Sequence, residues 1–148
     1  GFVATAPMTA VMYRMHRNLG RKKRYPLPPR EIVETVAPVL EGEPAKSTTL
    51  AAHFAYGALS GAALASIDRK PTITSGIAGG GGVWAASYFG WIPAAGILKP
   101  ASRHPGNRNK LMILAHVMWG SAFALTQRNL LKSRAAFGEG PLKDSARH

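Results

Sequence analysis

The chain has 148 residues, enough for one domain, and 46% of them are hydrophobic, which is ordinary for a globular protein. Its 19 Lys and Arg against 7 Asp and Glu give a formal net charge of +12, which points to nucleic acid, anionic lipid or a positively biased membrane topology. Because cysteine is absent, disulfide frameworks, thiolate zinc sites and cysteine nucleophiles are excluded.

Three long intervals carry no charged side chain. Asp, Glu, Lys and Arg are all missing from residues 47–67, 71–98 and 111–127. A helix crosses the roughly 30 Å hydrocarbon core of a membrane with about 17 to 25 residues, so each interval is long enough. The basic residues gather at the interval ends, whereas a nucleic-acid surface interleaves them with aromatics. We therefore predict an all-α, multi-pass cell-membrane protein with about four spans and no nucleic-acid partner; the alternative is a soluble basic RNA-binding protein.

The first apolar run, "GFVATAPMTAVMY", predicts a partial membrane helix from Phe2 to about Leu19. The run is apolar from its first residue, with no basic residue before it. We therefore expect that the helix begins upstream of Gly1 and that its first residues are missing from this sequence. Arg14 and Arg17 then lie near the helix end, with their stems buried and their charged heads in the interface.

The connector 20–48 is rich in proline, and only one part of it suits a helix. Pro28 and Pro29 favour a helix start, and Glu31 suits its positive end. Apolar residues then recur at helical spacing up to Pro38: Ile32, Val33 and Val36. This pattern predicts a short helix on the membrane surface, and the alternative is a solvated linker.

The second span is predicted at Thr49–Ile67, with Ser47 or Thr48 as its N-terminal cap. Gly57 and Gly61 form a GxxxG motif, which lets helix backbones approach closely in lipid. We expect both glycines at a helix contact.

The third span is predicted at Ile73–Ile97, with packing glycines at 76, 80 and 82 and a bend at Pro93. Although Gly80, Gly82 and Ala85 match a permissive dinucleotide fingerprint, the acidic residue expected about 20 positions later is missing. A phosphate-binding loop is therefore excluded.

Aromatic residues follow these glycines at positions i, i+4 and i+7, and the last span adds another. They predict membrane-interface contacts for four side chains: Trp84, Tyr88, Trp91 and Trp119.

The fourth span is predicted at Leu111–Gln127 and ends in the basic sequence "RNLLKSR". Residues 1–132 then form a single transmembrane domain, and 133–148 a polar C-terminal tail.

The order of these features, with "PLPPR" at Pro26 to Arg30 and with His116 and Trp119 in the last helix, resembles the YagU type of bacterial inner-membrane protein. These are small four-helix proteins of unknown function. The resemblance implies a bacterial inner-membrane location and supplies no catalytic residues.

Two histidines are the candidate binding residues. His53 follows Lys46 by seven residues and His116 follows Lys110 by six, which places both about 10 Å along their helices from one membrane face. Paired imidazoles suit haem, and a single one suits a chlorophyll-type pigment or a proton relay. The interpretation that we favour is that each histidine only bonds a local hydroxyl or carbonyl group, with no cofactor.

No constellation for catalysis or for a metal is present in the apolar runs. Their serines lack a carboxylate to complete a triad, and the H-E-x-x-H pattern is absent. We expect a non-catalytic accessory or helix-packing subunit, in contact with lipid and with other subunits or copies of itself. The rival hypothesis is a small transporter or channel that uses His53 and His116.

Overall fold

The computed structural model describes residues 1–19, 26–38 and 42–138, except for the side chains of 42–45 and 138, and all regular structure in these ranges is helical. The elements are α1 (Phe2–Arg17), α2 (Pro28–Val36), α3 (Gly42–Ile67), α4 (Ile73–Ala85), η2 (Ala86–Trp91), α5 (Ile92–Ala94), η3 (Ala101–Arg103) and α6 (Gly106–Gly138). The predicted all-α class is confirmed.

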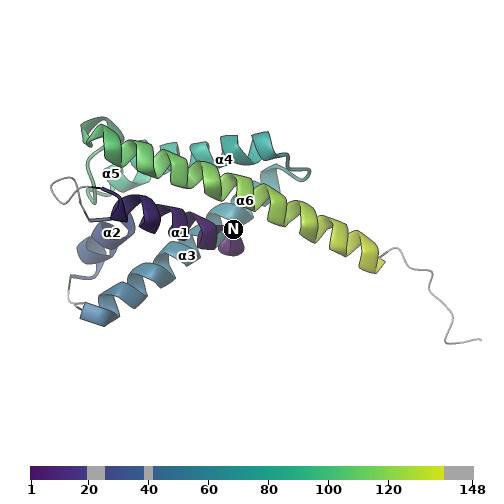
Figure 1. The fold of residues 1–148 in the computed structure, drawn as a ribbon, viewed down its shortest axis with the longest axis horizontal. Helices are drawn as coiled ribbons and strands as arrows, with labels where there is room; N and C mark the ends of the chain where they lie inside the picture. Colours follow the sequence, from purple (N-terminus) through teal and green to yellow (C-terminus); the bar gives the residue numbers. More distant parts are fainter. Residues whose placement is uncertain (20–25, 39–41, 139–148) are drawn as a thin grey trace, which may run out of the picture.

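The long helix α6 organises the molecule (Figure 1). Helix α4 lies along one side of α6, while α1 lies against α6 and α3, and α2 packs on α3. The core forms where α1, α4 with η2, and α6 meet. Its buried members include Met8, Met12, Tyr88, Leu111, Met112, Trp119 and Phe123.

Helices α4 and α6 cross at a backbone-to-backbone contact built from three glycines. A Cβ on Gly76 would collide with the carbonyl oxygen of Gly120, and a Cβ on Gly120 would collide with that of Gly76. Gly80 meets the carbonyl oxygen of His116 in the same way. Glycine is therefore required for the two helices to approach this closely.

The GxxxG motif of α3 receives the beginning of α1. A Cβ on Gly57 would collide with Oγ1 of Thr5, and one on Gly61 with the backbone of Gly1. The indole Nε1 of Trp119 donates to the same Thr5 oxygen at 3.2 Å, which ties α6 to this crossing. The glycine face of α3 is thus occupied within the chain.

A polar turn joins α3 to α4. Thr72 and Ser75 form a reciprocal capping box, and Ser75 Oγ also donates to Asp68 Oδ2 at 2.6 Å. The amide of Gln127 donates to the Asp68 carbonyl oxygen at 2.9 Å, which fixes the turn to α6.

The prediction of one continuous helix over Ile73–Ile97 is wrong. Helix α4 ends at Ala85, the next turn is wider, and Gly90 has non-helical angles of φ −104° and ψ −110°. A short helix resumes at Ile92 and ends at Ala94. Glycine makes the break accessible, and Pro93, which has no N–H to donate, sits where the new helix begins.

Three other predicted boundaries are also wrong. Helix α3 begins at Gly42 rather than at Ser47 or Thr48, so the connector 20–48 is shorter than expected. Pro44 falls in the first turn of α3, where a proline costs little. Helix α6 runs from Gly106 to Gly138 rather than over Leu111–Gln127, so the first residues of the predicted tail 133–148 are helical; the tail from 139 on lies outside the described residues.

The predicted surface helix is present in the connector as α2, Pro28–Val36, and it starts at the two prolines. It packs on the bundle through Pro28 and Val33, while Val36 is 69% exposed. The structure contains no membrane, so its position in an interface stays a prediction.

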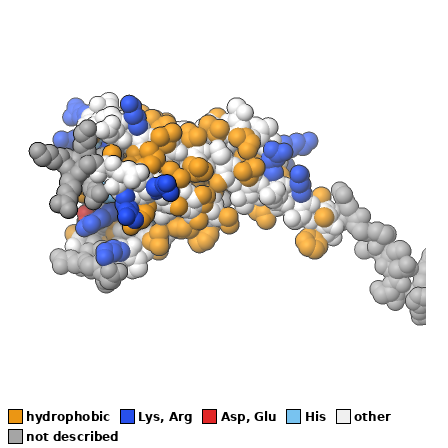
Figure 2. All heavy atoms as spheres, in the orientation of Figure 1, with side chains coloured by type: hydrophobic (Ala, Val, Ile, Leu, Met, Phe, Trp, Pro, Cys, Tyr) orange, Lys and Arg blue, Asp and Glu red, His pale blue; other side chains and the backbone are white. Residues whose placement is uncertain are grey.

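By length and composition, one helix of the described residues qualifies as a membrane span: Lys46–Ile67, within α3. One such helix is weak evidence, because core helices of soluble proteins meet the same test. Only 11% of its most apolar stretch is buried, however. Figure 2 shows Lys and Arg side chains gathered toward the two ends of the molecule, with hydrophobic side chains between them.

Candidate functional site

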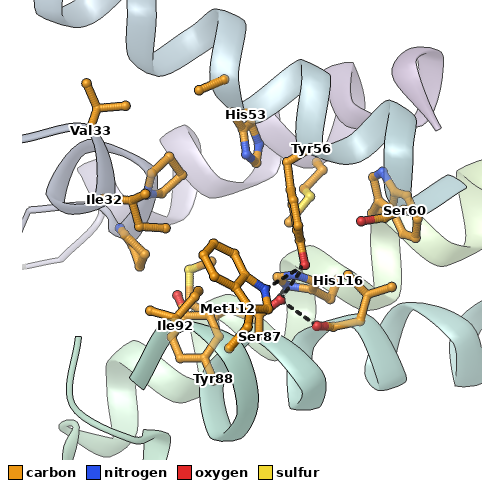
Figure 3. A pocket seen from close by; sticks show the side chains of 17 residues that line it. Ile32, Val33, His53, Tyr56, Ser60, Ser87, Tyr88, Ile92, Met112 and His116 are labelled. Carbon is orange, nitrogen blue, oxygen red and sulfur yellow. Dashed lines mark hydrogen bonds between the residues drawn. The ribbon is translucent and has the colours of Figure 1, made fainter. Parts of the chain in front are cut away.

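A cavity of about 220 Å³ lies between α3 on one side and η2 and α6 on the other (Figure 3). Helix α2 closes one end through Pro28, Pro29, Ile32 and Val33. Both candidate histidines, His53 from α3 and His116 from α6, line this cavity. The structure thus brings the two histidines to one cavity, while their depth in a membrane stays a prediction.

The ring of His116 is held by its own helix. Its Nδ1 lies 2.8 Å from the carbonyl oxygen of Met112, one turn earlier, and the residue is 7% exposed. A carbonyl oxygen can only accept, so Nδ1 carries the hydrogen in this bond. In the neutral ring, Nε2 then has a free lone pair and acts as a hydrogen-bond acceptor or a metal ligand.

His53 has a different environment. Its Nε2 is buried and has no hydrogen-bond partner among the described residues. The ring lies edge-on to Phe54, with the centroids 6.3 Å apart. A buried polar nitrogen without a partner carries a free-energy cost, which makes it a candidate for contact with a bound molecule.

A chain of hydrogen bonds links α3 to η2 beside His116 (Figure 3). Trp91 Nε1 donates to the Tyr56 hydroxyl at 3.3 Å, which is 2.7 Å from Ser87 Oγ. Ser87 donates to the carbonyl oxygen of Val83 at 2.7 Å, so the Tyr56 hydroxyl is the donor to Ser87. The N–H and O–H donors of Trp91, Tyr56 and Ser87 are therefore all used in bonds within the protein.

Sequence reasoning missed Tyr56 and Ser87 as parts of the site. They are 31 residues apart and come from different helices, so no local spacing joins them. The one usable signal was that Tyr56 lies three residues after His53, on the same face of α3.

An ion pair secures the closed end of the cavity. The Arg108 guanidinium of α6 forms a two-point hydrogen-bonded pair with the Glu31 carboxylate of α2, and the two side chains are 6% and 22% exposed. Since α2 supplies one wall, this pair helps to hold the cavity closed. The nearby imidazole of His104 has its pKa lowered below 6.5, first by burial and then by the charge of Arg108.

The four predicted interfacial aromatics separate into two groups. Trp119 is 2% exposed and Tyr88 is 3% exposed, so both belong to the core, and their predicted interfacial role is wrong. Trp84 stacks on Tyr88 with centroids 5.9 Å apart. Trp91 is 43% exposed and pairs with Tyr56 instead, because the wider turn of η2 rotates it out of the predicted stripe.

The predicted packing glycines separate in the same way. Gly57, Gly61, Gly76 and Gly80 lie at the two helix crossings described above. Gly82 is exposed and a Cβ there would meet nothing within 4 Å, so its predicted helix contact is wrong within this chain.

A haem or a chlorophyll-type pigment does not fit between His53 and His116. The cavity of about 220 Å³ is smaller than the roughly 300 to 1,000 Å³ of pockets that hold drug-sized ligands, and a macrocycle is larger still. Within the described residues, no cluster of three or more His, Cys, Asp or Glu side chains is placed to hold a metal ion. The geometry instead leaves room for one small molecule.

A scan of protein-family models and searches among curated proteins and solved structures found no match to this chain. The resemblance to YagU-type proteins therefore stays a prediction.

Proposed function

We propose that this chain is a non-catalytic, multi-pass membrane protein that works by packing against other membrane helices, as an accessory subunit of a larger assembly. The observation that carries the proposal is the low burial of the apolar stretch of α3. Its stretch Lys46–Ile67 is long and apolar enough to span a membrane, yet 11% of its most apolar stretch is buried inside the chain. Such a helix is stable in lipid, whereas in water it would expose a large apolar face.

The outward face of α3 has the composition of a helix-packing surface. Small residues occupy it at helical spacing around Leu59, which is 71% exposed. The exposed small residues are Ala51, Ala55, Ala62 and Ser66. Lipid provides no hydrophobic drive for helix association, so close van der Waals contact over small side chains is what joins membrane helices. Because α1 already covers the glycine face, this second face is the one left for a partner.

The exposed surface of α6 supports the membrane location. Apolar side chains are exposed along its middle, and these include Ile113, Leu114, Met118 and Leu125. The helix has 33 residues and so extends over about 50 Å, longer than the hydrocarbon core. Its continuation beyond Gln127 carries Arg128, Lys132 and Arg134, all exposed, whose stems can lie along lipid while their charges reach the interface.

The cavity chemistry supports a non-catalytic role. Its lining has two imidazoles and several hydroxyl groups, and among the described residues no carboxylate reaches it. A catalytic triad needs such a group to orient the imidazole and to stabilise its protonated form.

Photo-cross-linking tests the proposal. Leu59 is replaced by p-benzoylphenylalanine in native membranes, and Leu114 of α6, which is 51% exposed, is replaced in the same way as the matched control. We expect Leu59 to yield a defined protein adduct and Leu114 to yield mainly lipid adducts. Lipid adducts alone at both positions would remove the accessory-subunit proposal and leave the transporter alternative.

A further inference from the structure

We propose that the cavity between α3, η2 and α6 binds a lipophilic phenol, a membrane-soluble aromatic ring whose hydroxyl group donates a hydrogen bond to Nε2 of His116. This inference concerns a ligand site and is independent of the outward face of α3.

The histidine tautomer determines that the ligand must donate, and not accept, the hydrogen bond to His116. Nδ1 of His116 is committed as a donor to the Met112 carbonyl oxygen, so Nε2 can only accept in the neutral ring. A carbonyl compound has no hydrogen to offer it, whereas a hydroxyl compound does. The weak acidity of a phenol makes its O–H a better donor than that of an alkyl alcohol.

Four other polar side chains around the cavity have their donors engaged within the protein. The Trp91, Tyr56 and Ser87 donors are used in the chain that ends at Val83. The indole of Trp119 donates to Thr5. Nε2 of His53, in contrast, is buried with no partner among the described residues, and it can meet a second oxygen on the ligand.

The size and walls of the cavity favour a single ring. An apolar cavity of about 150 Å³ stays dry and binds benzene in another protein, so 220 Å³ accommodates a substituted benzene. The walls include the rings of Tyr88 and Trp119 and the thioethers of Met8 and Met112. Aromatic rings and methionine sulfur both make favourable contacts with an aromatic ligand.

The ligand has a route from the membrane. Ala52 of α3 and Trp91 of η2 both line the cavity and are both exposed, so the cavity opens sideways between these two helices. The opposite end is covered by α2, held by its ion pair to α6. A compound dissolved in lipid can therefore enter without crossing the polar end of the molecule.

A soft metal ion is the competing occupant. Imidazole nitrogens and methionine sulfurs suit Cu(I), and Met8 and Met112 line the same space as the two histidines. A lone ion would leave most of the 220 Å³ unfilled, so the structure favours the ring. Cu(I) is included as an arm of the test.

The test uses the full chain in detergent with ¹⁵N-labelled histidine. It is titrated with 4-propylphenol and, separately, with propylbenzene, and partition into empty micelles is subtracted. We expect the phenol to bind about tenfold more tightly, the effect of one buried hydrogen bond, and to shift the Nε2 resonance of His116. In His116→Phe the preference for the phenol should vanish, while His16→Phe, a histidine outside this cavity, should retain it.

A second pair of variants guards against misfolding of His116→Phe. Ala52→Phe fills the mouth of the cavity, and Ala51→Phe adds the same ring on the outward face of α3. Only Ala52→Phe should abolish phenol binding, with helix content unchanged in both. Equal binding of the two probes by the wild type, unchanged binding by Ala52→Phe, or an Nε2 shift with Cu(I) and none with the phenol would each overturn the proposal.

Discussion

Gly80 of α4 lies against the carbonyl oxygen of His116 in α6, so closely that a Cβ on Gly80 would collide with that oxygen. The residue whose ring faces the cavity thus has its backbone at the glycine crossing of α4 and α6. Helix packing and the candidate ligand site are therefore joined through His116.

This relationship predicts that Gly80→Leu destabilises the protein. The added side chain would force α4 from α6 at a backbone atom that cannot rotate away, and overpacking of this kind costs about 1 to 3 kcal/mol. Gly82→Leu is the control, since a Cβ there meets nothing within 4 Å. Thermal unfolding in detergent, followed by circular dichroism, should show a lower midpoint for Gly80→Leu alone. Equal midpoints would contradict the close crossing.

The α1–α3 crossing gives a second prediction. Gly57→Leu would collide with Thr5, the acceptor for the Trp119 indole, and would push α1 off α3. Ala63→Leu places the same side chain on an exposed position of α3. Yield and monodispersity in detergent should fall for Gly57→Leu and stay normal for Ala63→Leu. Identical behaviour of the two variants would count against the crossing.

The ion pair between Arg108 and Glu31 gives a third. Glu31→Gln leaves the Arg108 guanidinium, 6% exposed, without its carboxylate, and breaking a buried pair costs about 3 kcal/mol or more. Glu34→Gln breaks the exposed pair with Arg30, whose side chains are 65% and 43% exposed, and should cost under about 1 kcal/mol. The free energies of unfolding of the two variants, measured in the same detergent, test whether the buried pair contributes more to stability than the exposed pair. A smaller loss for Glu31→Gln than for Glu34→Gln would refute the anchoring role of the pair.

The lowered pKa of His104 predicts that stability depends on pH. Its pKa in the folded state is depressed from 6.5, mainly by burial, so the folded state resists protonation there. The stabilising contribution is present above about pH 6.5 and is lost as the pH falls below it, because the unfolded chain takes up the proton first. We expect the unfolding midpoint to fall between pH 7 and 5, and to fall less in His104→Gln. The same slope in the variant would assign the effect to another group.

The sequence was informative where the physical cause is local. Proline at a helix start and the missing charges over long intervals predicted α2 and the helical cores of α3 and α6. Gly90 could have been tolerated within a helix, and its break depends on how η2 packs on α3 through Trp91 and Tyr56. Pro44 was ambiguous for another reason: a proline can either end a helix or stand in its first turn.

The candidate site was only partly accessible to sequence reasoning. Counting residues from the helix ends brought His53 and His116 together, because helical rise is regular. The bond between Tyr56 and Ser87 and the contact of Gly80 with the His116 backbone depend on helix rotation and crossing, which spacing does not encode. The GxxxG motif indicated a contact, yet it could not tell that α1 of the same chain would occupy it.

The membrane location is the central claim, and alkaline carbonate extraction tests it most directly. Membranes from cells that express the full chain are washed with high salt and then with carbonate, and pellet and supernatant are compared with and without detergent. We predict that the protein stays in the pellet through both washes and is released only by detergent, because α3 and α6 expose apolar surface along their lengths. Release into the supernatant by salt or carbonate alone would contradict the account and favour a soluble basic protein.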